Sequence, residues 1–140
     1  MSTIKPHHFR QFIKNCKGFD KVLTNLIFLE AENGGCSAEL KIDENHINPL
    51  GTLHGGLSAT LVDVVSSLGL TTHNAAEYGH VSIDMHLTYY KSASIGEEIH
   101  IVSNLAKIGK KLAFLEVDIK NKESQEVLVR GTHVKFLLGG

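Results

Sequence analysis

A carboxylate and a pair of glycines lie on the most apolar segment of the chain, and together they indicate hydrolytic chemistry. Gly55 and Gly56 open the segment, and Asp63 interrupts its nearly continuous run of apolar residues. A helix that begins at two glycines has backbone N–H groups without side-chain cover, and the positive end of its dipole favours negative charge. Such a start can hold a developing oxyanion. With an acid on the same element, hydrolysis of an ester or thioester is predicted.

Asp63 has two interpretations. A carboxylate among apolar residues either pairs with a neighbouring polar group or faces a wet cleft, where it orients water or attacks directly to form an anhydride. Asn48 in the preceding loop is a candidate donor to a carbonyl oxygen, and its presence favours catalysis. His54 is a candidate base, although its place before two glycines favours a structural role at the start of the helix.

Composition limits the class of protein. The 140 residues, 42% of them hydrophobic and 21% charged, are expected to form a single globular domain, 1–140. A net charge of −1 argues against nucleic acid as a partner. No apolar stretch reaches the length of a membrane span, so no membrane insertion is expected. Cys16 and Cys36 have no CxxC spacing and the histidines form no helical HxxxH pair, so no metal site is expected.

Residues 1–18 are predicted to form an amphipathic helix ending near Gly18. Apolar side chains recur there at the helical spacing, at Phe9, Phe12, Ile13 and Cys16. The segment is basic and free of acids, which is also typical of a mitochondrial targeting segment, but a helix packed on its own domain is favoured. We therefore expect a cytoplasmic protein and leave a mitochondrial location open.

Strands of alternating polarity flank a helix predicted over 55–72. Strands at 22–31 and 36–43 form a hairpin closed by Gly34-Gly35. Later strands are predicted at 81–89, 99–107, 113–121 and 127–138. In the first of these, Val81, Ile83, Met85, Leu87 and Tyr89 are expected on one face and Ser82, Asp84, His86 and Thr88 on the other. A helix that is apolar on almost every side must be enclosed, so we predict an α+β domain with a curved antiparallel sheet around it.

The spacing of the candidate groups predicts a dimer. Asp63 follows Gly55 by eight residues, which is about 12 Å along a helix axis. Reacting groups lie within about 3–3.5 Å of one another, so a carbonyl held at Gly55 is out of reach of water on Asp63 of the same helix. Either the two residues belong to different sites, or a two-fold axis brings Asp63 of one chain to Gly55 of another.

Residues 48–63 resemble the hotdog-fold acyl-coenzyme A thioesterases, and the likeness covers nearly the whole chain. The matching signature is Gly51-Thr52-Leu53-His54-Gly55-Gly56-Leu57, Ala59-Thr60-Leu61-Val62-Asp63, Val81-Ser82 and Asp84-Met85. Further matches are Leu87-Thr88-Tyr89, Lys107, Gly109-Lys110 and Leu112-Ala113-Phe114. The resemblance implies a sheet of about six strands around one central helix. It also implies homodimers with interface sites, paired into homotetramers, and hydrolysis of acyl-coenzyme A to free acid and coenzyme A without a cofactor.

The resemblance also assigns roles to residues. Asp63 and Ser82 orient or activate the attacking water. Asn48 and the Gly55 N–H polarise the thioester carbonyl, and His54 supports the loop. The residues implied to contact the substrate are Ser82, Tyr89, Tyr90, Lys91, Lys107, Gly109, Lys110 and Leu112. On residue type alone Ser82 is an ordinary strand serine, and the lysines near Gly109 are an ordinary solvated turn.

Two positions depart from the family pattern. After Tyr89 the chain lacks the proline that relatives carry before Ala93, and Lys91 supplies a charge that relatives often place later. Phe136 stands where a relative carries a polar, ligand-contacting residue. Medium-to-long fatty acyl chains are the expected substrates, because each buried methylene contributes about 0.8 kcal/mol. The alternatives are a non-catalytic acyl-coenzyme A sensor and a dehydratase, which needs a histidine at the substrate's α and β carbons.

Overall fold

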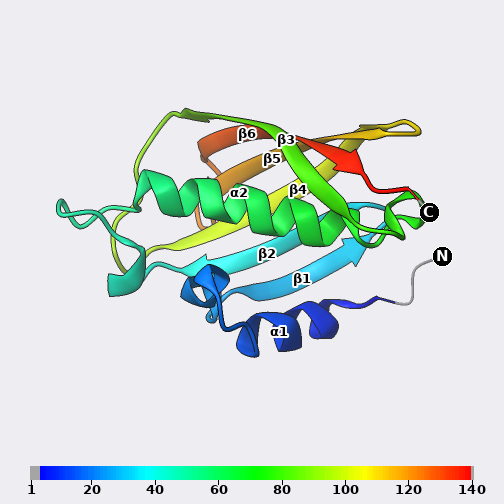
Figure 1. Ribbon diagram of the computed structural model, residues 1–140. Coiled ribbons are helices and arrows are strands. Elements are labelled where there is room, and N and C mark those ends of the chain that lie inside the picture. The colour runs from blue at the N-terminus through cyan, green and yellow to red at the C-terminus, as the bar shows by residue number, and fades with distance from the viewer. Residues whose placement is uncertain (1–3, 140) are drawn as a thin grey trace.

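The chain folds as a six-stranded antiparallel sheet curled around one long helix. The computed structural model describes residues 4–139. The sheet has the order β1-β2-β4-β5-β6-β3. Its strands are β1 (Ile27–Glu32), β2 (Gly35–Lys41), β3 (His80–Tyr89), β4 (Glu98–Ile108), β5 (Leu112–Asn121) and β6 (Val127–Leu137). Figure 1 shows helix α2 (Gly55–Leu70) lying across the concave face of the sheet. The predicted wrapping of a curved sheet around a central helix is confirmed.

Helix α2 is enclosed because its sequence leaves almost no polar side. Leu61, Val62 and Val65 have no exposed surface, and the helix packs mainly on β2 and β4. Gly69 allows the close approach: a Cβ added there would lie 2.9 Å from the Cβ of Cys36 on β2. The predicted boundaries, 55–72, exceed the observed helix by two residues at its C-terminal end.

The N-terminal segment differs from the prediction in two ways. Helix α1 (Pro6–Lys14) ends at Lys14, before the predicted end near Gly18, and a 3-10 helix, η1 (Phe19–Leu23), occupies the start of the predicted 22–31 strand. The strand therefore begins only at Ile27. Burial of Leu23 and Leu26 explains the error, since these apolar residues serve a packed turn rather than a strand face. The predicted helix 1–18 and domain 1–140 also include residues 1–3 and 140, which lie outside the described residues.

Helix α1 packs against β1 as expected for a helix that belongs to the domain. Phe9 and Ile13 are buried, whereas Phe12, predicted on the same face, is 55% exposed. Arg10 donates a hydrogen bond over 2.8 Å to the carbonyl of Phe28 in β1. The β1–β2 hairpin turns at Asn33 and Gly34, with φ of 50° and 91°, rather than at the predicted Gly34-Gly35 pair. Positive φ at both central residues is the geometry of a tight two-residue hairpin.

Strand β3 contains a bulge that reverses part of its predicted facing. Ser82 pairs with Lys135 and Asp84 pairs with Val134, so Ile83 is the extra residue. Residues directly opposite in a sheet point to the same face, and Lys135 is buried on the helix side. Ser82 therefore faces α2, and Asp84 faces outward with Val134. The prediction that Ser82 and Asp84 share a face is wrong, because a single extra residue changes the alternation.

In the described part of the chain, no helix is long and apolar enough to cross a membrane. The short connections include two further 3-10 helices, η2 (Glu44–His46) and η3 (Asn74–Ala76). η2 precedes the loop that carries Asn48, and η3 connects α2 to β3.

Candidate active site

The start of helix α2 carries an unpaired backbone donor. The Nδ1 atom of His54 accepts a hydrogen bond over 2.8 Å from the Gly56 N–H, so His54 caps the helix. The first-turn N–H groups of Leu57 and Ser58 bond to the carbonyl of His54. Among the described residues, the Gly55 N–H has no partner. The favoured structural role of His54 agrees with this geometry, and Gly55 keeps a donor free at the positive end of the helix.

The loop before the helix fixes the amide of Asn48. Its Oδ1 accepts hydrogen bonds from the N–H groups of Leu50, at 3.0 Å, and Thr52, at 3.1 Å. Its Nδ2 donates to the hydroxyl of Thr52 over 2.9 Å. An amide nitrogen carries two hydrogens, so one remains for a ligand. Asn48 and Gly55 line the same cavity of about 320 Å³, which also includes Tyr89 and Lys91.

The end of β3 packs over the start of α2. The hydroxyl of Tyr89 donates a hydrogen bond to the carbonyl of Gly55 over 2.8 Å. Tyr90 lines the same cavity. Lys91 forms an exposed ion pair with Glu126 at 2.9 Å, which raises the pKa of the lysine. We refer to Asn48, Gly55, Tyr89, Tyr90 and Lys91 as the amide half-site.

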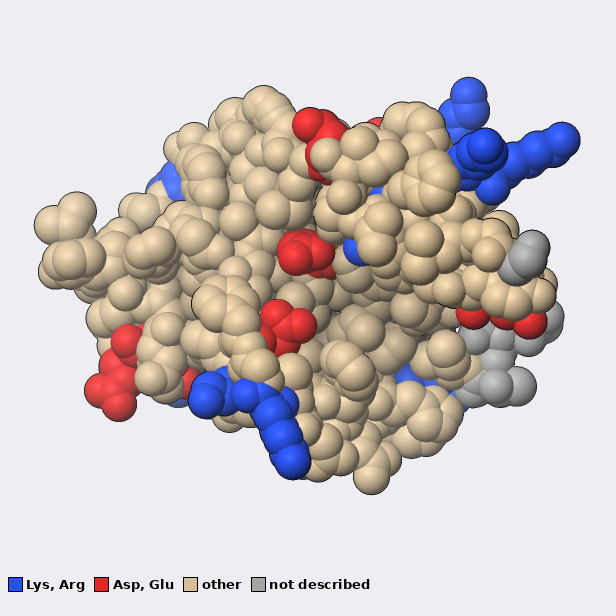
Figure 2. All heavy atoms as spheres, in the orientation of Figure 1, with Lys and Arg blue, Asp and Glu red and all other residues tan. Residues whose placement is uncertain are grey.

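Two turns further along α2, Asp63 is half-exposed and is held by a buried cation through a serine. Lys135 on β6 donates a hydrogen bond over 2.9 Å to the hydroxyl of Ser67, which donates over 3.2 Å to Oδ1 of Asp63. Lys135 is only 5% exposed, and burial lowers its pKa. Figure 2 shows acidic side chains near the middle of this otherwise largely uncharged face.

His133 on β6 connects Asp63 with Ser82. Its Nε2 lies 2.7 Å from the Ser82 hydroxyl and 4.0 Å from Oδ1 of Asp63. Its Nδ1 lies 2.8 Å from the hydroxyl of Ser66. His133 has no exposed surface; burial first, and Lys135 second, lower its pKa, so the imidazole is neutral near pH 7. We refer to Asp63, Ser67, Ser82, His133 and Lys135 as the acidic half-site.

The turn between β4 and β5 lies at the end of the sheet that carries the acidic half-site. Leu112 pairs with Phe136 of β6, and Phe136 also pairs with Val81 of β3, next to Ser82. Lys107, Gly109 and Lys110 are exposed around this turn. The two segments implied to contact the substrate, Tyr89–Lys91 and Lys107–Leu112, therefore lie at opposite ends of the sheet of one chain, as Figure 1 shows for the ends of β3 and β4.

The structure thus brings the predicted residues together as two groups. Within one chain, Gly55 and Asp63 are separated by about 12 Å along α2. Ser82 and Tyr89 are separated by seven residues of β3, or about 20 Å. Each group has part of what hydrolysis of a thioester needs, because donors for the oxyanion are in one and acceptors for a water are in the other.

His133 and Lys135 were not predicted as site residues. A signal was present: with Leu137 they alternate along β6 on a face that is buried. Buried histidine and lysine need polar partners, so their occurrence on a core-facing register indicates a polar network. Ser66 and Ser67, one turn after Asp63 on α2, are the other members that were missed.

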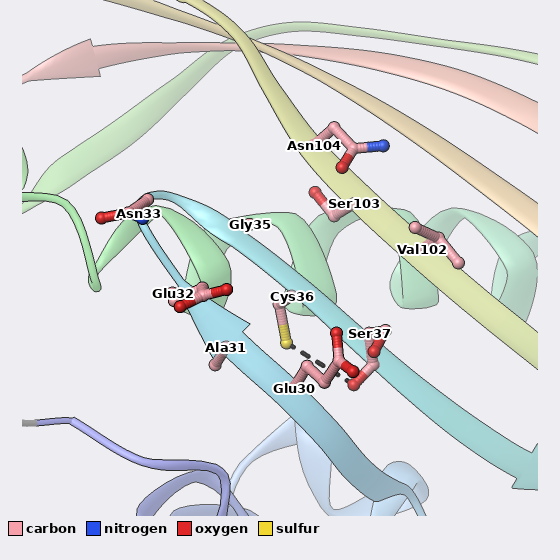
Figure 3. Close-up of a pocket in the computed structure, with 10 residues that line it drawn as sticks. All are labelled: Glu30, Ala31, Glu32, Asn33, Gly35, Cys36, Ser37, Val102, Ser103 and Asn104. Carbon is pink, nitrogen blue, oxygen red and sulfur yellow. Dashed lines mark hydrogen bonds between the residues drawn. The ribbon is translucent and has the colours of Figure 1, made fainter.

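A separate cavity of about 270 Å³ lies near the β1–β2 turn, as Figure 3 shows. It contains Glu30, Glu32 and Cys36 but none of the predicted site residues. Burial raises the pKa of the Cys36 thiol to about 12, so the sulfur stays protonated and is a poor nucleophile. In residues 4–139, no cluster of histidine, cysteine and acidic side chains has the arrangement of a metal site.

The comparisons with known proteins decide the family. A model of the thioesterase superfamily matches residues 50–128. Acyl-coenzyme A thioesterase 13 of Mus musculus is 45% identical over 120 residues, which cover 86% of this chain and 85% of that protein. Its Homo sapiens counterpart is 40% identical over 138 residues, covering 96% of this chain and 98% of that protein. The chain belongs to the thioesterase superfamily.

Structural similarity confirms the predicted hotdog fold for this thioesterase. The crystal structure of zebra fish thioesterase superfamily member 2 superposes with a TM-score of 0.91 at 37% identity, covering 97% of this chain and all 100% of that one. The matches to acyl-coenzyme A thioesterase 13 and to thioesterase superfamily member 2 confirm the predicted resemblance to the hotdog-fold acyl-coenzyme A thioesterases. The thioesterase superfamily model ends at residue 128, so His133 and Lys135 lie beyond the matched range.

Proposed function

We propose that the protein hydrolyses acyl-coenzyme A thioesters at sites shared between two subunits. The observation that carries the proposal is the separation of two complementary half-sites. The free Gly55 N–H lies at the start of α2 and Asp63 near its middle, whereas Ser82 lies near the start of β3 and Tyr89 at its end. The thioesterase relatives named above support thioester hydrolysis as the reaction.

The exposed edge of β3 supports the dimer. β3 ends the sheet order and pairs only with β6 among the described residues. Val81, Ile83 and Met85 are 50%, 56% and 38% exposed on it. Apolar side chains on an open edge strand favour pairing with another strand. Antiparallel pairing of two β3 strands, centred near Met85 and His86, would bring Ser82 opposite the partner subunit's Tyr89, and hence one acidic half-site beside one amide half-site.

In the joined site, the thioester carbonyl accepts hydrogen bonds from the Gly55 N–H and the Asn48 amide of one subunit. Water attacks the carbonyl carbon while Asp63 of the other subunit takes its proton. When the C–S bond breaks, Asp63 returns that proton to the departing thiolate, giving free acid and coenzyme A. No cofactor enters these steps.

The substrate's ends have separate candidate contacts. The charged coenzyme A end is assigned to Lys91, with Tyr89 and Tyr90 beside it, of one subunit and to the Lys107–Leu112 turn of the other. A hydrogen bond from the N–H of Gly109 to the carbonyl of Leu112 closes that turn. The acyl end is expected to favour medium-to-long chains, since each buried methylene contributes about 0.8 kcal/mol. The pairing of two dimers into a homotetramer remains a prediction, and so does the cytoplasmic or mitochondrial location of the protein.

The geometry favours hydrolysis over the alternatives. A dehydratase needs a histidine that reaches substrate carbons. His133 is fully buried with both ring nitrogens hydrogen-bonded, and the ring of His54 is held at the helix start by the Gly56 N–H. A non-catalytic sensor has no need of a free oxyanion donor and a positioned acid together. Thiol release from a panel of acyl-coenzyme A esters distinguishes the sensor from the enzyme and gives the chain-length preference.

Subunit complementation tests the shared site. Asp63→Asn and Asn48→Ala each remove one half of every site, and we expect each alone to lower kcat at least about a hundredfold. Mixed and refolded together, they form heterodimers in which one site has an intact Asp63 and an intact Asn48. Random pairing restores about one quarter of wild-type activity if sites are shared. Mixtures no more active than the separate variants would refute a shared site.

A further inference from the structure

We propose that His133 is a positioning residue that keeps the Ser82 hydroxyl as a hydrogen-bond acceptor toward the attacking water. The inference deepens the proposed function and rests on it only for the identity of the reaction. It follows from counting the hydrogens available in the chain Asp63–Ser66–His133–Ser82.

Ser66 sets the direction of the chain. Its hydroxyl has one hydrogen but two neighbours, the backbone carbonyl of Asp63 at 3.2 Å and Nδ1 of His133 at 2.8 Å. Because the carbonyl only accepts, Ser66 can satisfy both neighbours only if it donates to Asp63 and accepts from His133. The neutral imidazole therefore carries its hydrogen on Nδ1.

The remaining direction follows from that tautomer. Nε2 has no hydrogen, so Ser82 donates its own to His133 across 2.7 Å. With the opposite tautomer, the chain of residues has two hydrogen bonds instead of three. Ser66 would then donate to Nδ1 of His133 and could no longer donate to the Asp63 carbonyl. In a site where His133 has no exposed surface, an extra satisfied hydrogen bond decides between the two.

The charges around the imidazole agree with its neutral form. Lys135 on β6 opposes protonation, whereas Asp63 on α2 and Asp84 on β3 favour it, and burial has the largest effect. His80 on β3 is the other titratable group of this cluster, and its own pKa is lowered first by burial and then by Lys135 and His133. The neutral ring keeps one donor and one acceptor, as the chain requires.

The consequence for catalysis is a water with both hydrogens bound. Ser82 donates its one hydrogen to His133, so its oxygen can only accept hydrogen bonds from groups in the site. Ionised Asp63 is also an acceptor only. A water that donates to both has its lone pair free for the carbonyl carbon. A donating Ser82 would instead occupy one of the two lone pairs of the water and leave one of its hydrogens without an acceptor.

The tautomer is measured on the wild-type protein by two-dimensional ¹⁵N–¹H NMR of the histidine side chains near pH 7. We expect His133 to carry its hydrogen on Nδ1, with Nε2 in the unprotonated range. A hydrogen on Nε2 would overturn the proposal. The measurement uses no substrate, so it stands whether or not the protein hydrolyses thioesters.

Two substitutions separate positioning from packing. In His133→Gln the amide oxygen can occupy the place of Nε2 and accept from Ser82, whereas His133→Asn replaces only the Nδ1 side and leaves Ser82 without its acceptor. We expect His133→Asn to lower kcat about tenfold more than His133→Gln, with KM for acyl-coenzyme A nearly unchanged in both. Equal losses of kcat in two folded variants, or losses confined to KM, would overturn the role. Absence of thioesterase activity in the wild type would instead refute the proposed function.

Discussion

The ammonium group of Lys135 donates a hydrogen bond to the hydroxyl of Ser67 over 2.9 Å, although the lysine is only 5% exposed. Burial of an ammonium costs free energy, and the lowered pKa of Lys135 reflects that cost. The hydrogen bond turns the Ser67 hydroxyl so that it donates to Asp63. A buried cation thus orients the acid through an intermediate serine.

Replacement of Lys135 should separate stability from activity. Lys135→Met keeps the length of the side chain and removes the buried charge, so we expect thermal stability to be maintained or increased. We expect kcat to fall about tenfold, because Ser67 loses the donor that orients it. Thermal unfolding and steady-state kinetics on the same preparation check both. A large loss of stability with unchanged kcat would make Lys135 a structural residue.

The edge of β3 gives a test of assembly. Ile83→Asp places a charge on an exposed apolar position of the strand that we propose to pair between subunits. We expect a folded monomer with kcat/KM lowered at least about a hundredfold, since each subunit keeps only half-sites. Sedimentation measures the mass and circular dichroism the fold. Phe19→Asp is the control, because Phe19 is 74% exposed on η1, away from β3, and should leave the dimer active.

The ion pair of Lys91 and Glu126 gives a test of coenzyme A binding. Both side chains are more than half exposed, so the pair itself contributes little to stability. Lys91→Gln should raise KM for acyl-coenzyme A about tenfold with little change in kcat, because a contact to the substrate's phosphates is lost. Glu126→Gln should lower KM by freeing the lysine. If both variants keep the wild-type KM, the nucleotide binds elsewhere.

Acid should destabilise the fold through His80. Burial, with Lys135 and His133 nearby, lowers the pKa of His80 from 6.5 to about 4. Between these values the unfolded chain binds a proton that the folded chain does not, so the free energy of unfolding falls as the pH drops through this window. His80→Gln should show a smaller fall in melting temperature between about pH 7 and about pH 4.5. If His80→Gln shows the same fall as the wild type, the acid sensitivity lies in another group.

The sequence was sufficient to predict the layers of the fold and the elements that carry Asp63 and Gly55. Helix α2 and the later strands have strong periodicity, and their ends agree within two residues. The N-terminal region was harder to predict, because apolar residues such as Leu23 and Leu26 are buried as readily in a packed turn as in a strand. The direction of Ser82 was not predictable, since a bulge leaves no mark in the alternation itself.

The acidic half-site was only partly predictable for a related reason. Asp63 is conspicuous on an apolar helix, but its partners Ser67 and Lys135 are brought to it by sheet order rather than by sequence proximity. His133 is 70 residues from Asp63 in the chain, and only the pairing of β6 with β3 places it beside Ser82. Such long-range neighbours follow from the topology.

The bulge at Ile83 makes the register of β3 as important as its residues. A regular ladder through the same residues would place Ile83 opposite Lys135 and Ser82 opposite Phe136, and it would turn Ser82 away from the helix. The strand would gain regularity while the hydroxyl lost its imidazole. In this fold a local irregularity of the backbone is therefore a requirement for the proposed chemistry, and a regular β3 with every reactive side chain intact would be an inert one.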